Sequence, residues 1–131
     1  MVTVNIRGTD FPLCLTVAAL ERLSIECGDL KGLPDYLNGG EEKNLCQSAY
    51  NAAYLLGILV EEGEEHRCME ERFSGGDSSR RKVPSPEDLT RLLNFQETRA
   101  YLPMIWAAID ESLHQDIAAE APKNGTGGAE E

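Results

Sequence analysis

Apolar residues alternate with polar ones at the start of the chain. The alternation covers residues 2–7 and resumes over residues 11–15, after a turn at residues 8–10 (Gly-Thr-Asp). A period of two is typical of a strand with one buried face. Pro12 cannot donate a backbone hydrogen bond, which places that part of the second strand on a free edge. The pattern predicts a β-hairpin.

A helical period follows the hairpin. Thr16 is suited to cap the start of a helix, and Gly28 is suited to end it. The predicted buried face consists of the apolar residues between them, namely Val17, Leu20 and Leu23, with Ala18, Ala19 and Cys27 alongside. Because a lone two-stranded hairpin is marginal in water, we expect this helix to pack across it.

A long apolar segment predicts a central helix over residues 42–62. Apolar residues occupy most of its circumference, and only Gln47, Ser48 and Asn51 are plainly polar. A helix of this kind is normally surrounded by other elements. Residues 61–82 are dense in charge and contain Ser-Gly-Gly-Asp-Ser-Ser, so they predict a mobile exposed loop, whose first part either leaves the helix or continues it past Gly63.

The last third of the chain predicts further helices. Ser85 is suited to cap a helix that starts with Pro86 and turns its leucines at 89, 92 and 93 inward. Apolar residues then recur at helical spacing from Tyr101 onward, namely Leu102, Ile105, Trp106, Ile109 and Leu113. Pro103 either opens this helix or kinks a longer one. After Ala119 the low hydrophobicity predicts a disordered tail.

Together these elements predict an α+β fold, in which an N-terminal two-stranded hairpin packs against three or four helices. We expect residues 1–119 to form a single compact domain with a mobile charged loop at about 61–82, and residues 120–131 to form the disordered tail. The aromatic residues Tyr50, Tyr54, Tyr101 and Trp106 are predicted mainly as core. Trp106 lies at the edge of its helix's apolar arc, which leaves a partner contact open.

Net charge narrows the choice of partners. The chain has 23 acidic and 12 basic residues, a net charge of −11. Phosphate backbones and anionic membrane surfaces repel such a protein, so we expect it to bind neither nucleic acid nor a membrane. The N-terminus has no secretion signal and no segment is apolar enough to span a bilayer, which predicts a cytoplasmic protein. Cysteines at 14, 27, 46 and 68 match neither a zinc nor a disulfide pattern, so we expect free thiols.

Few residues are equipped for chemistry. His66 and Cys68 form the one Cys/His pair, in the predicted charged loop, where rigid positioning is not expected. The paired acids at 61–62, 64–65 and 70–71 lack a calcium-loop pattern and predict a solvated segment. Arg80-Arg81-Lys82 is interpreted as local charge balance. Neither Gly-Gly pair is followed by the Lys-Ser/Thr of a phosphate loop. We therefore expect no catalytic residue, cofactor or metal, and no enzymatic activity.

The N-terminal third resembles the small tail-assembly chaperones of long-tailed phages and prophages. The resemblance lies in Val4-Asn5-Ile6-Arg7-Gly8, Phe11-Pro12-Leu13 and Thr16-Val17-Ala18-Ala19-Leu20-Glu21. It implies a non-enzymatic chaperone in the host cytoplasm that binds the tape-measure protein, with tail-tube subunits as a further client, until the tail polymerises. Many members also occur as a longer frameshifted form, for which Lys123-Asn124 is the candidate slippery site.

Two other functions remain open from the sequence. The acidic surface suits a DNA mimic that inhibits a nucleic-acid-binding protein, although the basic residues interspersed in the charged segment do not favour a linear array of carboxylates. An adaptor subunit of some other cytosolic assembly is the second alternative. We expect a protein partner to contact the apolar arc of the last helix, at Tyr101, Leu102, Trp106 and Leu113. The same arc would suit self-association.

Overall fold

The computed structural model describes residues 1–77 and 79–120, with side chains described as far as Leu113. In chain order the elements are β1 (Thr3–Ile6), β2 (Thr9–Pro12), α1 (Val17–Cys27), the 3-10 helix η1 (Leu30–Gly32), α2 (Leu33–Leu37), α3 (Leu45–Phe73), α4 (Pro86–Leu92) and α5 (Phe95–Glu120). The predicted α+β class, a hairpin packed against helices, is confirmed.

The hairpin is tighter than the sequence suggested. β1 and β2 are antiparallel, and Ile6 pairs with Thr9 across a turn made of Arg7 and Gly8. Both turn residues have positive φ, 52° and 91°, as two-residue hairpin turns require. Asp10 pairs with Asn5, so the prediction that residues 9 and 10 belong to the turn is wrong.

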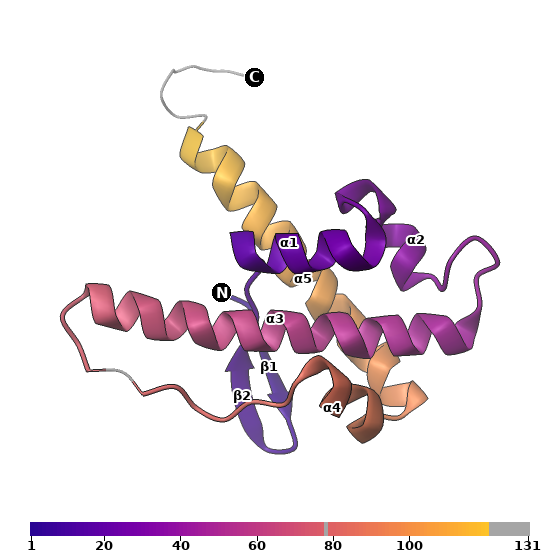
Figure 1. Cartoon of the computed structure of the whole chain (residues 1–131), viewed down its shortest axis with the longest axis horizontal. Coiled ribbons are helices and arrows are strands. Elements are labelled where there is room, and N and C mark those ends of the chain that lie inside the picture. Colours follow the sequence, from indigo (N-terminus) through magenta and orange to yellow (C-terminus); the bar gives the residue numbers. More distant parts are fainter. Residues whose placement is uncertain (78, 121–131) are drawn as a thin grey trace.

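Helix α3 is the centre of the molecule. It crosses the view in Figure 1, with α1 on one side and the hairpin and α4 on the other, and it contacts β2, α1, α2, α4 and α5. The core gathers on its middle turns, where Leu55, Leu56 and Leu59 have no exposed surface. The hairpin adds Val4, Ile6 and Phe11 to this core, and α5 adds Ile105, Ala108 and Ile109.

The first turns of α3 start later than predicted and bury two residues that were predicted to be on the polar side. The helix begins at Leu45, three residues later than predicted, because the Asn44 side chain caps it by accepting a hydrogen bond from the Gln47 amide. Ser48 and Asn51, predicted on the polar side, are buried. Their side chains donate to the carbonyls of Leu37, at 2.6 Å, and Tyr36, at 2.7 Å, and thereby anchor the C-terminal end of α2.

Of the two alternatives for the start of the charged segment 61–82, the structure shows the continued helix, because α3 runs through Gly63 to Phe73; the predicted loop is wrong as far as residue 73. Ion pairs at helical spacing support this extension: Glu64 with Arg67, Arg67 with Glu71, and His66 with Glu70. The non-helical segment is confined to residues between Phe73 and Pro86, of which Ser78 is outside the described residues.

Helix α1 has the predicted caps but a different buried face. The Thr16 hydroxyl accepts a hydrogen bond from the Ala19 amide at 3.0 Å, and Gly28 ends the helix with a φ of 87°. Ala19 and Leu23 are buried, whereas Val17 is 84% exposed. Steps of three residues rotate the direction by about 60° each, so Val17 and Leu23 point roughly 120° apart. The predicted face was therefore too wide.

The C-terminal helices resolve the two readings of Pro103. Ser85 caps α4 in a reciprocal capping box with Asp88, as the sequence indicated. Helix α5 runs from Phe95 with Pro103 inside it, so this proline does not open a helix. Glu120 still belongs to α5. The rest of the predicted tail, including Lys123-Asn124, lies outside the described residues.

Candidate protein-binding surface

The structure separates the four residues predicted to contact a partner. Tyr101, Leu102 and Leu113 are half-buried against the core, and the Tyr101 hydroxyl donates to the Asn5 carbonyl at 2.8 Å. Trp106 is 39% exposed and is not among the residues packed against that core. Most of the predicted surface is thus already used in packing α5 onto the core.

A different helix exposes apolar side chains beside hollows in the surface. On α1, Val17 and Ile25 are 84% and 78% exposed. A hollow of about 360 Å³ lies at the start of the helix, and Val17 and Leu20 help to line it. A second hollow, of about 380 Å³, lies at its end, where Leu20, Leu23 and Leu30 line it. We call Val17, Leu20, Leu30 and these two hollows the α1 face.

The sequence contained part of the signal for this surface. Residues 13–15 were expected to extend a strand, but β2 ends at Pro12 and the chain then turns toward α1, so that Leu13 and Leu15 line the first hollow. Val17 was assigned to the core because it is apolar and close to Leu20. Helical geometry alone places it on the side opposite to the buried Ala19, about 160° away.

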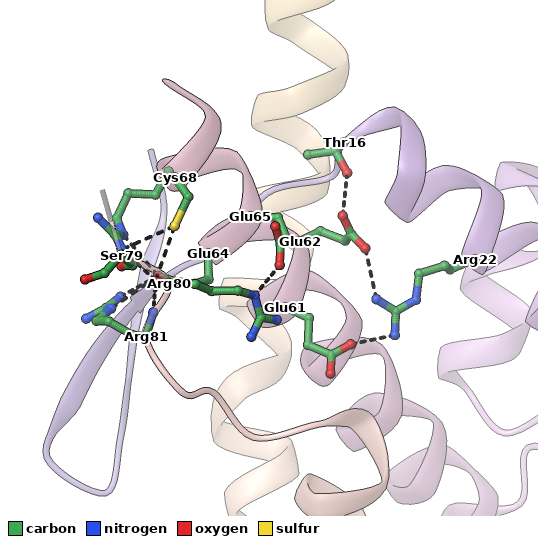
Figure 2. A network of polar contacts seen from close by, with 11 residues as sticks. Thr16, Arg22, Glu61, Glu62, Glu64, Glu65, Cys68, Ser79, Arg80 and Arg81 are labelled. Atoms are coloured by element: carbon green, nitrogen blue, oxygen red, sulfur yellow. Dashed lines mark hydrogen bonds and ion pairs between the residues drawn. The ribbon is translucent and has the colours of Figure 1, made fainter. Parts of the chain in front are cut away.

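The carboxylates in the middle of α3 are paired with arginines of α1, of α3 itself and of the segment after α3 (Figure 2). Arg22 of α1 reaches Glu61 at 2.7 Å and Glu62 at 3.0 Å. Arg80, from the segment after α3, pairs with Glu65. The interpretation of these acids as a solvated segment is therefore wrong, since they fasten neighbouring elements to α3.

Glu64 is the centre of this network. Its side chain is fully buried and accepts hydrogen bonds from Arg67, at 2.6 Å, and from the backbone amide of Arg81, at 2.7 Å. The hydrogen bond from Arg67 is the main cause that lowers the pKa of Glu64 to about 2; Arg81 adds to it, and burial opposes it. The carboxylate therefore stays ionised and is unsuited to general acid catalysis near neutral pH.

Arg81 extends the network to the hairpin. Its guanidinium lies 5.3 Å from the centre of the Phe11 ring and donates to the carbonyl of Asp10 at 3.2 Å. The basic triplet at 80–82 thus does more than balance charge locally, because two of its members hold the segment after α3 against α3 and β2.

The predicted Cys/His pair does not form a reactive site. The Cys68 sulfur is buried 3.8 Å from a Glu64 oxygen, whereas His66 pairs with Glu70 at 3.4 Å and lines the first hollow. That hollow brings His66 together with Cys14 instead. Burial, followed by the charge of Glu111, raises the pKa of the Cys14 thiol. A thiol held in its protonated form is a poor nucleophile, so the pair is not suited to covalent catalysis.

In the part of the chain with described side chains, no group of three or more His, Cys, Asp or Glu residues is arranged to hold a metal ion. None of the described helices contains a segment long and apolar enough to cross a bilayer. Comparison of the chain with protein-family models, with curated proteins and with solved structures gave no match in any of the three.

Proposed function

We propose that this chain is a non-enzymatic tail-assembly chaperone that holds an apolar helical segment of the tape-measure protein on the α1 face. The observation that carries the proposal is the exposure of Val17 at the first of two hollows that share Leu20. Exposed apolar surface next to concave surface is typical of protein-binding sites. Tail-tube subunits are a further candidate client.

The geometry suits capture of an amphipathic helix. Such helices bind by laying their apolar side chains into hydrophobic grooves, with anchor residues three, four or seven positions apart. In the proposed complex, one anchor of the client enters each hollow, and Leu20 packs between the two anchors. The same residues of α1 belong to the segment that resembles the tail-assembly chaperones, Thr16-Val17-Ala18-Ala19-Leu20-Glu21.

Charge supports this proposal over a DNA mimic. A mimic requires free carboxylates spaced like phosphates. Here Glu61, Glu62, Glu64 and Glu65 are paired with arginines, which neutralises the densest acidic run of the described chain. The net charge of −11 serves instead to keep a carrier soluble while it covers an apolar client.

Co-expression with the products of the neighbouring genes tests the proposal. We expect the tagged chain to retain a long, helical tape-measure protein in the soluble fraction, identified by mass spectrometry after affinity purification. Val17→Asp should abolish this retention. Phe73→Asp is the matched control, because Phe73 is an equally exposed apolar residue, 85%, at the end of α3.

Two outcomes would contradict the proposal. If neighbouring genes encode no tail proteins and their products do not bind, the chain is an adaptor of another assembly. If the client stays soluble with Val17→Asp as well as with the natural chain, the α1 face is not the site of capture.

A further inference from the structure

A stacked pair of tyrosines lies on α3, and neither tyrosine lines the hollows of the α1 face. The rings of Tyr50 and Tyr54 are 6.1 Å apart, with planes 18° from parallel. Tyr50 is 50% exposed, so its ring is accessible to a partner although the sequence predicted it as core. Stacked aromatic faces on a protein surface are suited to bind cations, because the ring quadrupole is negative above and below the plane.

Two carboxylates outside the described ion pairs act on Tyr54. The Tyr54 hydroxyl lies 3.5 Å from a Glu87 oxygen, on α4. Glu26, at the end of α1, acts electrostatically on Tyr54 and on Tyr36 of α2, which places it on the same side of the molecule. Across residues 1–77 and 79–113, no Lys, Arg or His forms an ion pair with Glu26 or Glu87.

We infer that Tyr50, Tyr54, Glu26 and Glu87, which we call the tyrosine face, bind an arginine side chain of a partner polypeptide. The planar guanidinium stacks on an aromatic ring and donates hydrogen bonds to carboxylates at its edge. A lysine ammonium, which is compact and strongly hydrated, fits such a site less well.

The chain itself uses this combination elsewhere. Arg81 lies over the ring of Phe11 while it donates to Glu64. At the tyrosine face the rings and the carboxylates are present, and the described cation that acts on Tyr54, Arg22, is already paired with Glu61 and Glu62. The excess of acidic over basic residues, 23 against 12, makes a basic partner the complementary one.

This site does not depend on the proposed chaperone function. Leu20 and Glu26 point about 120° apart on α1, so the two surfaces lie on different sides of that helix. A partner with an apolar helix and a nearby arginine would engage both. If the α1 face does not bind the tape-measure protein, arginine binding at the tyrosine face can still be tested separately with the peptide described next.

A fluorescein-labelled, alanine-based peptide with three arginines provides the probe, and the same peptide with neutral citrulline in place of arginine provides its control. Binding is measured by fluorescence anisotropy at low salt. We expect Tyr50→Leu to weaken binding of the arginine peptide about two- to tenfold, and Tyr50→Phe, which keeps the ring, to change it less than about twofold. The citrulline peptide should bind weakly to every variant.

The contribution of the Glu26 and Glu87 carboxylates to peptide binding is tested with two double variants that remove the same charge. Glu26→Gln with Glu87→Gln should weaken binding at least about threefold more than Glu41→Gln with Glu42→Gln, which removes the same charge from an exposed loop. Equal losses in the two double variants would show that only net charge attracts the peptide and would overturn the inference. Equal affinity of Tyr50→Leu and the natural chain, or of the citrulline and arginine peptides, would also overturn it.

Discussion

Glu64 carries a charge in a place where no side-chain surface is exposed. The carboxylate is tolerated there because Arg67 and Arg81 both donate to it and because the Arg81 amide completes its hydrogen bonding. Removal of the charge leaves two guanidiniums with unmatched donors beside the buried Cys68. The residue therefore matters for stability and not for chemistry.

We expect Glu64→Gln to lower the free energy of unfolding by about 2 to 4 kcal/mol, somewhat less than the loss of a fully buried partner, because both guanidiniums reach solvent. Glu65→Gln breaks an exposed pair with Arg80 and should cost less than about 1 kcal/mol. Urea unfolding of the two variants compares these values. Similar losses in both would show that burial does not set the contribution of Glu64.

Low pH should weaken the pairing of Glu64 with Arg67 and Arg81, because it protonates the carboxylate. The pKa of Glu64 is about 2 in the folded chain and near its usual 4.5 in the unfolded chain. The unfolded state therefore takes up a proton first as pH falls, and stability present above about pH 4.5 is lost toward pH 2. We expect the natural chain to lose more stability than Glu64→Gln over this range, as measured by urea unfolding at each pH. Parallel pH profiles would contradict this assignment.

At the scale of elements, α3 owes its packing to two glycines. A Cβ on Gly63 would lie 2.0 Å from the carbonyl oxygen of Pro12, and one on Gly57 would lie 2.4 Å from the Cα of Pro86. These residues mark where β2 and the start of α4 press against the helix backbone. Gly63 is thus a contact point, and not the helix end that its position before a charged run suggested.

Gly63→Ala separates packing from helix propensity. Alanine is favoured over glycine within a helix by about 1 kcal/mol, so propensity alone predicts a stabilised protein. We expect the opposite, a loss of about 1 to 3 kcal/mol, because the hairpin must move away from α3. Thermal unfolding gives the sign directly. A higher melting temperature for Gly63→Ala would refute the close contact.

Features set by neighbouring residues were predictable, and those set by distant ones were not. Thr16 and Ser85 start their helices and Gly28 ends its helix, as the sequence indicated. Caps of this kind depend on residues three or four positions away. The burial of Ser48 depends on a carbonyl of α2, and that of Glu64 on Arg81, 17 positions along the chain. The extension of α3 past Gly63 was predictable in part, from acids and arginines spaced three and four apart.

At the scale of the whole molecule, α1 separates two surfaces of different character. The side with Leu20 borders the two hollows, of which the first is lined by His66 and Glu111 as well as by apolar residues, and the side with Glu26 lies toward Tyr54. The sequence placed partner contacts on α5, because an amphipathic pattern does not tell which apolar residues the rest of the fold will cover. The α1 face emerges only once the hairpin and α5 are in place around it.

The affinity of the proposed client, a purified tape-measure protein, for three forms of the chain tests this account most directly. By isothermal titration calorimetry, Val17→Asp should bind at least about tenfold more weakly than the natural chain, because an anchor of this size contributes roughly 1.5 kcal/mol or more when buried. Phe73→Asp should bind within about twofold of the natural chain. Equal affinity of Val17→Asp and the natural chain would contradict the claim that α1 holds the client.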